Sequence, residues 1–519
     1  MSDETITFII LGATVVVFVW DRLQVAVVAV GVALSLWATG VLDLDQSLAG
    51  FGDPTVIFIA SLFVVSEALD ATGVTTWAGQ QLIERAGESR TRVLVLMMLL
   101  CAGVTALITV NGAVAALVPV VVLMGVRLRR EPSQLLMPLA FAAHAGSLLV
   151  LTGSPVNVVI SEAADDAGVG RIGFFEFGLV GVPLLAGTIA IVVLFGERLL
   201  PHRSPHSMPM DFSAHARTLV HQYGLDDADT VMTRSKGAAE VVIPPRSGLV
   251  GETAFPGMVT ESGDLVVLAV QRKGEELPGE TRLAVGDTLL LQGTWGALEE
   301  HLTDPDVLVV DRPELVRRQA VPLGAGAGRA IVVLAAMVIL LATGAVPPAV
   351  AGLLAAGALV VSGVLSIEQA YRGVGWTTVI LVAGMISLST AMTESGAAER
   401  LADGLLDVVG DAGPHALLLA LVVLVFVLGQ LISNMATALI VIPIAISAAG
   451  ELDVSPKPVL VAVAVASAAS FLTPVATPAN LMVMEPGGYR FGDYWKLGLP
   501  LLTLFGVVAV LLVPVFWSF

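Results

Sequence analysis

The stretch QLISNMATALIVIPIAI, from Gln430 to Ile446, decides the fold of this chain. It is an apolar run that is interrupted by Ser433 and Asn434, and the pattern then predicts a helix of small residues as far as Pro443. Polar groups at the depth of a bilayer are costly unless they are buried in protein or line a cavity. Asn434 is therefore expected either to join helices by hydrogen bonding or to form part of a binding site.

A constant spacing relates this stretch to three other polar interruptions. In the second half of the chain, Asn480 in TPVATPAN follows Asn434 by 46 residues. In the first half, Asn157 in TGSPVN follows Asn111 in ITVNGAV by the same 46 residues. Subtracting 323 converts both second-half asparagines into their first-half equivalents. Repeated broken helices are typical of secondary transporters, and the alternative is two similar bundles held together by asparagine hydrogen bonds.

The composition indicates a polytopic membrane protein. The 519 residues are 56% hydrophobic and 13% charged, whereas soluble domains carry about 25% charged residues. The start, MSDETITFII, lacks a basic segment, so we expect no cleaved signal peptide. The single cysteine, Cys101, excludes a disulfide within the chain, and the net charge of −18 argues against nucleic-acid binding. Nucleotide-binding loops, hydrolase motifs and metal-ligand clusters are absent from the sequence, so neither an enzyme nor an ATP-driven pump is expected.

The apolar runs predict two copies of one membrane unit. Residues 1–200 form the first repeat and residues 326–519 the second, each with five crossings and a re-entrant helical hairpin. On this plan fifteen Lys and Arg residues fall on one side of the membrane and three on the other, namely Arg171, Arg400 and Lys457. The basic side is expected to be cytoplasmic, so that both termini are external. Because five is an odd number, the second repeat enters from the opposite face, and the topology of the repeats is inverted.

Residues 201–325 predict a small soluble domain between the repeats. The alternating runs AEVVIPP, DLVVLAVQR and DTLLLQG predict strands, and WGALEEHL predicts a helix. The fold class is therefore an all-α polytopic membrane protein in the plasma membrane, with an inserted α+β domain expected in the cytoplasm. Two roles for the insert stay open, which are dimerisation and the binding of a cytoplasmic ligand that regulates transport.

The breaks themselves predict a site for an anion. Ser154 and Thr477 are each followed by proline, which is the arrangement of a helix cap and a first helical position. The dipole and the free N–H groups at such a helix start favour an anion, while the carbonyl groups that end the preceding helix favour a cation. None of the breaks contains an acidic or basic residue. His144 lies in an apolar span, where it either senses pH or contacts the substrate, or else packs as a neutral, hydrogen-bonded side chain.

The motifs resemble those of a known family. SNMATALIVIPI resembles the Ser-Asn-Thr hairpin motif of the divalent anion/sodium symporters, the solute carrier 13 type of the ion transporter superfamily, and TGSPVN and ATPAN resemble that family's proline-containing loops. The insert, from VVIPPRSGLVGETAF to VGDTLLLQGTWGALEEHL, resembles a TrkA carboxy-terminal (RCK-C) domain. The resemblance implies a homodimer that carries out sodium-coupled symport of a small divalent anion, sulfate-like or a dicarboxylate, by an elevator mechanism. It implies sodium as the coupling ion and no organic cofactor.

The resemblance also implies the residues of the site, although both tips depart from the family motif. The first tip reads Val-Asn-Gly and the second Ser-Asn-Met, where the family has Ser-Asn-Thr. The implied sodium ligands are Asn111, Thr152, Gly153, Ser433, Asn434 and Ala476. The implied substrate-binding residues are Asn111, Ser154, Asn157, Asn434, Thr437, Thr477 and Asn480.

Two other functions remain as alternatives. A cation/proton antiporter of the same superfamily would need a buried carboxylate at the site, and only Glu67, Asp70 or His144 could take that role. An RCK-regulated ion channel would fit the insert, but it would need a selectivity filter of the TVGYG type, which the sequence lacks.

Overall fold

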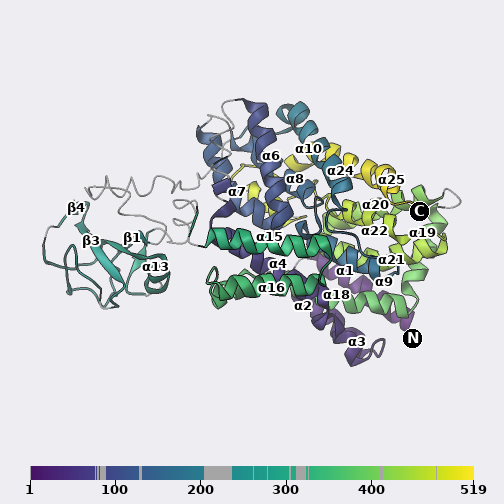
Figure 1. Ribbon diagram of the computed structural model, residues 1–519, viewed down its shortest axis with the longest axis horizontal. Helices are drawn as coiled ribbons and strands as arrows, with labels where there is room; N and C mark the ends of the chain where they lie inside the picture. Colours follow the sequence, from purple (N-terminus) through teal and green to yellow (C-terminus); the bar gives the residue numbers. More distant parts are fainter. Residues whose placement is uncertain are drawn as a thin grey trace. The chain divides into compact units, whose positions relative to one another are not determined.

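The computed structural model of the chain divides into two compact units, which are described separately (Figure 1). The membrane unit comprises Met1–Asp70, Gln81–Met208 and Gly328–Phe519, and the insert unit comprises Ala71–Gln80 and Pro209–Ala327. The structure describes residues 2–20, 22–75, 77–78, 81, 89–127, 131–203, 236–260, 262–277, 279–302, 305–310, 323–324, 326–409, 413–474 and 476–519.

The membrane unit is helical in both of its halves, and α10 and α24 from the two halves lie side by side (Figure 1). The helices of the first half are α1 Asp3–Trp20, α2 Val25–Ala38, α3 Leu44–Leu48, η1 Ala49–Gly52, α4 Pro54–Ala71, α6 Arg90–Leu107, α7 Val110–Arg127, η2 Pro132–Gln134, α8 Leu136–Gly146, η3 Leu151–Gly153, α9 Pro155–Asp166 and α10 Gly178–Leu199. Those of the second half are α15 Ala327–Thr343, α16 Pro348–Val361, α17 Ile367–Gly373, α18 Trp376–Glu394, α19 Ala397–Val409, α20 Pro414–Leu431, α21 Asn434–Glu451, α22 Pro456–Ser467, α23 Pro478–Met484, η5 Phe491–Asp493, α24 Tyr494–Val507, η6 Val508–Leu512 and α25 Val513–Phe516.

The local structure repeats at the same offset of 323 residues as the sequence. The bounds of α2 and α16 differ by this number at both ends. The capping box that Asp43 forms with Gln46 at the start of α3 recurs at the start of α17, where Ser366 pairs with Gln369. In a capping box, side chains satisfy backbone N–H groups at the helix start. The duplication therefore extends from the sequence to the ends of individual helices, while the orientation of the copies in a membrane stays a prediction.

Two close helix crossings join the copies. Between α2 and α18, a Cβ atom on Gly384 would lie 2.5 Å from the carbonyl oxygen of Ala29, and between α4 and α16 a Cβ atom on Gly352 would lie 2.9 Å from Cβ of Ser61. At the offset of 323, Ser61 is equivalent to Gly384, and Ala29 to Gly352. Helix α2 thus packs against α18, the equivalent of α4, and α16, the equivalent of α2, packs against α4 in the same way. Small residues are needed there because they let two helix backbones approach closely.

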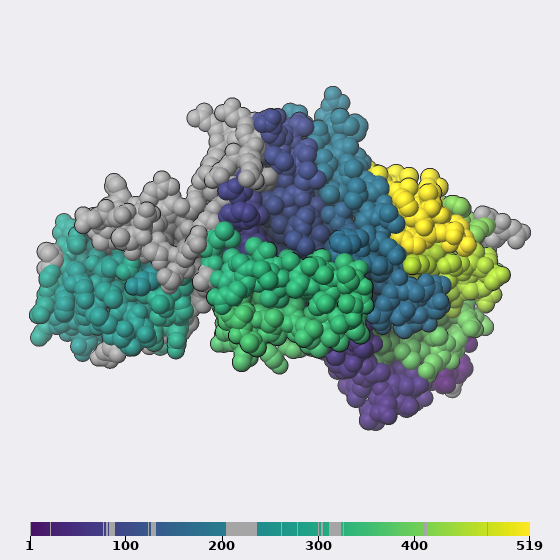
Figure 2. Space-filling view, in the orientation of Figure 1, coloured from purple at the N-terminus to yellow at the C-terminus, as the bar shows by residue number. Residues whose placement is uncertain are grey.

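The surface of the membrane unit is apolar enough to contact lipid. Within the described residues, eight helices are long and apolar enough to span a membrane. Large apolar side chains are exposed on α15 and α16, which are drawn in green in Figure 2. Val332 is 68% exposed and Val361 is 89% exposed. Exposed apolar surface of this kind is unfavourable in water and marks a region that contacts lipid or another protein.

The first hairpin breaks just before its asparagine. Helix α6 ends at Leu107 and α7 begins at Val110, so the chain is non-helical only at Ile108 and Thr109. Asn111 consequently lies in the first turn of α7. The sequence predicts Asn111 near the tip of the hairpin, and the structure agrees with that position.

The second hairpin has the same form, but its second helix is longer than expected. Helix α20 ends at Leu431, and α21 begins at Asn434 and runs to Glu451, with Pro443 inside it. The predicted helix end at Pro443 was wrong. A proline within a helix removes one backbone hydrogen bond, but buried membrane helices tolerate this because their neighbours satisfy the freed group.

An asparagine braces each of the two proline-containing breaks. The side-chain Nδ2 of Asn157 donates hydrogen bonds of 2.7 and 3.1 Å to the carbonyl oxygens of Ser147 and Val150. Asn480 makes the two equivalent bonds in the second copy, at 2.7 and 3.0 Å. These carbonyl groups belong to the loop between the two half-helices, where no helical partner is available. The asparagine amides therefore satisfy backbone acceptors that would otherwise be buried and unpaired.

The insert unit is built around a five-stranded antiparallel sheet in the order β4-β3-β6-β1-β7, with a separate two-stranded sheet of β2 and β5. Leu289, Leu291 and Trp295 lie in its apolar core. Its elements are β1 Lys236–Val242, β2 Thr253–Ala254, β3 Leu265–Arg272, β4 Glu275–Glu276, β5 Thr281–Arg282, β6 Thr288–Thr294, α13 Trp295–His301 and β7 Leu308–Val309.

The three predicted strands and the predicted helix of the insert are confirmed as β1, β3, β6 and α13. The four remaining strands have two residues each, which is too short for an alternating pattern to be seen. Buried Asp287 pairs with Arg272 at 2.7 Å, and the hydrogen bonds from this guanidinium lower the pKa of Asp287. The domain bounds at 201 and 325 and the likeness to an RCK-C domain stay predictions, and residues 204–235 and 311–322 lie outside the described part.

We predict that replacing Asn480 by alanine destabilises the membrane unit. The change leaves the carbonyl groups of Ser470 and Thr473 without a partner, at a cost of about 1–3 kcal/mol for each unsatisfied buried group. The apparent melting temperature of the detergent-solubilised chain should therefore fall. Asn480→Asp should lower the melting temperature as much, because an ionised carboxylate has no hydrogen-bond donors. Thr39→Ala, at the exposed residue that follows α2, is the control and should not change the melting temperature. Wild-type melting of both Asn480 variants would contradict the role of the brace.

Candidate functional site

A cavity of about 290 Å³ lies within the membrane unit where the four breaks meet. On a comparable measure a single water molecule needs only about 10–15 Å³, so the cavity has room for a small solute. Both copies contribute to its walls. The lining residues are Val25, Phe63, Thr109, Val110, Asn111, His144, Ser147, Gly153, Ser154, Pro155, Val156, Asn157, Thr377, Thr378, Leu381, Ser433, Asn434, Met435, Ala464, Ser467, Ala468, Ala476, Thr477 and Pro478.

Three long helices begin at this cavity. The amino end of a helix carries the positive end of the helix dipole, which favours an anion. Helices α7, α9 and α21 each present their first two residues to the cavity, which are Val110 and Asn111, Pro155 and Val156, and Asn434 and Met435. Three helix starts thus create a positive potential in the cavity without an ionised side chain.

The first turn of α9 is capped by the chain itself. Ser154 Oγ accepts the N–H of Val156 at 3.2 Å, and the carbonyl oxygen of Ser154 accepts the N–H of Asn157 at 3.1 Å. Pro155, the remaining residue of this turn, has no N–H. Residues 155–157, the first turn of α9, therefore offer no unpaired N–H group to an anion. The helix dipole and the hydroxyl proton of Ser154 remain available to a solute.

The hairpin helices start in the same way. Thr109 Oγ1 accepts the N–H of Gly112 at 3.2 Å at the start of α7. Ser433 Oγ accepts the N–H of Ala436 at 3.3 Å at the start of α21. A hydroxyl group is the preferred cap because its oxygen accepts a hydrogen bond from the first turn while its proton stays free to donate. The caps therefore turn helix starts into hydroxyl donors at the edge of the cavity.

His144 joins the two copies at the cavity. It lies on α8 of the first copy and is buried, and its Nε2 atom is 3.3 Å from Oδ1 of Asn480 and 3.3 Å from Oγ1 of Thr477. Because both hydrogens of the Asn480 amide are donated to loop carbonyls, its Oδ1 is an acceptor. We therefore assign the proton of the imidazole to Nε2. His144 is hydrogen-bonded within the protein and also lines the cavity. A packing role as a neutral side chain is therefore compatible with a contact to the substrate.

The amide of Asn434 is oriented by a serine of the neighbouring break. Oδ1 of Asn434 accepts a hydrogen bond from Oγ of Ser470. The Nδ2 group of Asn434 is thus the part of the amide that is available to a solute in the cavity. Gln430 holds the same loop, since its Nε2 lies 3.4 Å from the carbonyl oxygen of Ala469 and its Oε1 accepts the N–H of Leu472 at 3.2 Å.

The residues at the cavity that could hold sodium offer oxygen atoms only. Gly153 and Ala476 can supply backbone carbonyl groups, and Ser433 and Asn111 can supply side-chain oxygens, whereas Oδ1 of Asn434 already accepts the hydroxyl of Ser470. Hard oxygen ligands of this kind suit an alkali cation, and the carbonyl ends of broken helices coordinate Na⁺ in other transporters. The residues at both breaks therefore have the chemistry to hold a sodium ion.

Most predicted site residues meet at the cavity, and three do not line it. Asn111, Gly153, Ser154, Asn157, Ser433, Asn434, Ala476 and Thr477 line it. Thr152 instead donates its hydroxyl to the carbonyl oxygen of Ala106 at 3.0 Å, and Asn480 braces its loop. The hydroxyl of Thr437 is buried in α21 without contributing to the cavity wall. Sequence reasoning missed Ser147, Thr377, Thr378 and Ser467, and for Ser467 the signal was its equivalence to His144 at the offset of 323.

The described residues that line the cavity include no Asp, Glu, Lys or Arg, and His144 is the one titratable side chain among them. Glu67 and Asp70 do not line it. A solute in this cavity is thus held by dipoles and hydrogen bonds alone. An anion gains from this arrangement because the helix starts and hydroxyl protons all present positive ends.

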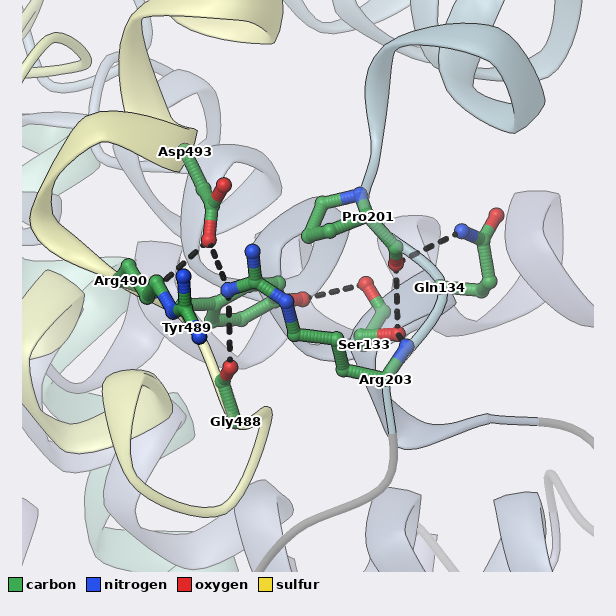
Figure 3. Close-up of polar contacts among 8 residues, drawn as sticks. All are labelled: Ser133, Gln134, Pro201, Arg203, Gly488, Tyr489, Arg490 and Asp493. Atoms are coloured by element: carbon green, nitrogen blue, oxygen red, sulfur yellow. Dashed lines mark hydrogen bonds and ion pairs between the residues drawn. The ribbon is translucent and has the colours of Figure 1, made fainter.

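A cluster of polar contacts fastens the chain that leaves α10 to the loops on either side of the site (Figure 3). The guanidinium of Arg203 lies 2.5 Å from the carboxylate of Asp493 and 3.3 Å from the carbonyl oxygen of Gly488. The backbone N–H of Arg203 donates to Oγ of Ser133 at 3.0 Å, and the hydroxyl of Tyr489 donates to the carbonyl oxygen of Ser133. These bonds tie the loop before α8 to the loop after α23. Helix α8 carries His144, and α23 begins just after Thr477.

Comparisons with known proteins find transporters that resemble this chain. The "Uncharacterized transporter YfbS" of Escherichia coli (strain K12) is 30% identical over 614 aligned positions, which cover 100% of both chains. "Sodium/sulfate cotransporter 1" of Chlamydomonas reinhardtii is 25% identical over 309 positions, covering 56% of this chain and 34% of that protein. The crystal structure of the YdaH transporter of Alcanivorax borkumensis matches with a TM-score of 0.52 at 14% identity, covering 97% of this chain and 99% of that one, and shows a shared fold.

The family comparison gives the assignment. The predicted resemblance to divalent anion/sodium symporters is confirmed by these relatives, which are transporters rather than enzymes. The family described as "Citrate transporter" (CitMHS) matches residues 15–449 and 337–519. This match covers most of the chain. The chain therefore belongs to the CitMHS family of citrate transporters.

Proposed function

We propose that this transporter carries out sodium-coupled symport of a small divalent anion, sulfate-like or a dicarboxylate, as a homodimer with an elevator mechanism. The observation that carries the proposal is the cavity wall. Three helix starts and the hydroxyl caps present positive ends there, and none of the described lining residues carries a fixed charge. The relative named as a sodium/sulfate cotransporter supports the choice of ions.

A neutral site suits a transported anion better than a basic one. A lysine or arginine would bind the anion strongly in a site of low dielectric constant, and the ion would then leave slowly. Dipoles and hydrogen bonds contribute less to affinity, so binding and release both stay accessible. Sodium at the neighbouring carbonyl oxygens would add positive charge only when both ions are present. Such mutual dependence is the basis of coupled symport, because each ion then raises the affinity for the other.

The alternatives lack a matching feature in the described residues. A cation/proton antiporter needs a carboxylate at the site, and neither Glu67 nor Asp70 lines the cavity. His144 does line it, but its Nε2 proton is already donated within the protein. For an RCK-regulated ion channel, the sequence offers no potassium filter.

We predict sodium-dependent anion uptake that requires both hairpin asparagines. In proteoliposomes, labelled sulfate or succinate should accumulate under an inward sodium gradient and not without it. Asn111→Ala and Asn434→Ala should each lower uptake at least about tenfold, since a hydrogen bond to a charged group is worth about 1.5–3 kcal/mol.

The matched control is Ser35→Ala, at an exposed position on α2, which should transport like the wild type. Light scattering in detergent should show that each variant keeps the mass of the wild-type dimer. Near-normal uptake by both asparagine variants would contradict the site. Equal uptake of the labelled anions with and without the sodium gradient would contradict the assignment of sodium as the coupling ion.

We also propose that the two membrane repeats are inverted and that both termini are external, with the insert in the cytoplasm. The support is the bias of fifteen basic residues to three across the predicted connections. A cytoplasmic ligand that binds the insert and regulates transport would fit this placement.

We predict that cysteines introduced at Ser2 and Ser518 react with an impermeant thiol reagent in intact cells. A cysteine at the exposed position Glu275 of the insert should react only after permeabilisation. The native Cys101 is buried and gives little background. Labelling of either terminus only after permeabilisation would overturn the proposed topology.

A further inference from the structure

The cavity is not symmetric, although it is built from two equivalent copies. Ser147 and Asn157 of the first copy line it, whereas their equivalents in the second copy, Ser470 and Asn480, do not. The other residues of the two breaks correspond only in part, since Ser154 and Thr477 both line the cavity, whereas Val156 lines it and its equivalent Ala479 does not. The open space therefore reaches deeper at the break before α9, which we call the first break, than at the break before α23, which we call the second break.

One pair of equivalent residues accounts for this difference. The imidazole of His144 reaches across to the second break and contacts Thr477 and Asn480, each at 3.3 Å. At the offset of 323 the equivalent of His144 is Ser467, which ends α22 and also lines the cavity. By the symmetry of the copies, Ser467 stands at the first break as His144 stands at the second. A hydroxymethyl group fills far less space than an imidazole ring, so the first break stays open.

Ser467 has an unused hydroxyl group. The residue is 2% exposed, and its Oγ atom has no hydrogen-bond partner among the described residues. Leaving a buried hydroxyl unpaired costs free energy, so such a group in a cavity wall indicates a partner that binds there. A hydroxyl can donate one hydrogen bond, which suits the oxygen of an anion.

The surroundings of Ser467 favour an anion as that partner. Helix α9 has twelve residues and begins at the same break, with Pro155 and Val156 at the cavity. Ser154 Oγ already accepts the N–H of Val156, so the proton of its hydroxyl is free to donate. In contrast, α23 at the second break has seven residues, and Thr477 there is in contact with His144. The first break thus offers the hydroxyl of Ser467 in addition to that of Ser154, whereas at the second break the Nε2 proton of His144 is already donated within the protein.

We propose that the cavity holds one oxyanion group off centre, in a subsite at the first break, with Ser467 as a direct substrate contact. The space there stays open because the second copy has Ser467 at the position that His144 occupies in the first copy. This inference rests on the proposed anion transport and adds the position of the substrate. The bound group is either a whole sulfate ion or one carboxylate of a dicarboxylate, since both present oxygen atoms that accept hydrogen bonds.

The test compares two substitutions of Ser467 in the full-length purified protein. Ser467→Ala removes the donor and leaves the space, so the dissociation constants for sulfate and succinate should rise about ten- to a hundredfold. Ser467→His fills the subsite and should abolish binding of both anions. Binding is measured by calorimetry in saturating sodium, and uptake kinetics should show the loss for Ser467→Ala in KM rather than in kcat.

The matched control is Thr188→Val on α10, which removes another buried hydroxyl that has no partner among the described residues and does not line the cavity. It should bind both anions as the wild type does. If only one anion responds to Ser467→Ala, that anion is the ligand of this subsite. Wild-type dissociation constants in Ser467→Ala would overturn the inference while leaving the proposed transport intact. Failure of the wild-type protein to bind or transport either anion would overturn both.

Discussion

The membrane unit depends on one constraint, which is that backbone polar groups exposed by a broken helix must be satisfied where no water is available. The structure meets this constraint with side chains of two kinds. Hydroxyl groups cap the helix starts, and the amides of Asn157 and Asn480 close the loops before them. Once these groups are paired, the helix starts can converge on a common cavity without unpaired backbone around it. The site for a solute is therefore a consequence of how the breaks are stabilised.

This way of building a site also determines its charge. Because the breaks are satisfied by neutral side chains, the positive potential in the cavity comes from helix dipoles and hydroxyl protons. The duplication places equivalent groups on both sides, and the difference between His144 and Ser467 helps to make the two sides unequal. A transporter with symmetric architecture can thus hold its substrate in an asymmetric position.

Much of the fold could be predicted from the sequence because its determinants are local. The Ser-Pro and Thr-Pro pairs specify helix starts, and the offset of 323 relates residues whose side-chain bonds later proved equivalent. The contact of His144 with the second break could not be predicted, because it joins residues more than 330 positions apart. The sequence also assigned Thr437 and Asn480 to substrate, whereas the structure buries Thr437 in a helix and uses the Nδ2 group of Asn480 to brace its own loop. The path of α21 through Pro443 depends on packing by its neighbours rather than on local preference.

The central claim is that the converging helix starts bind an anion without a charged side chain. The most direct measurement is the location of selenate, an analogue of sulfate with strong anomalous scattering, in a crystal of the protein grown with sodium. The account predicts one anomalous peak in the cavity, close to the starts of α7, α9 and α21. Anomalous peaks only at basic residues of the surface, with none in the cavity at selenate concentrations that inhibit uptake, would contradict it.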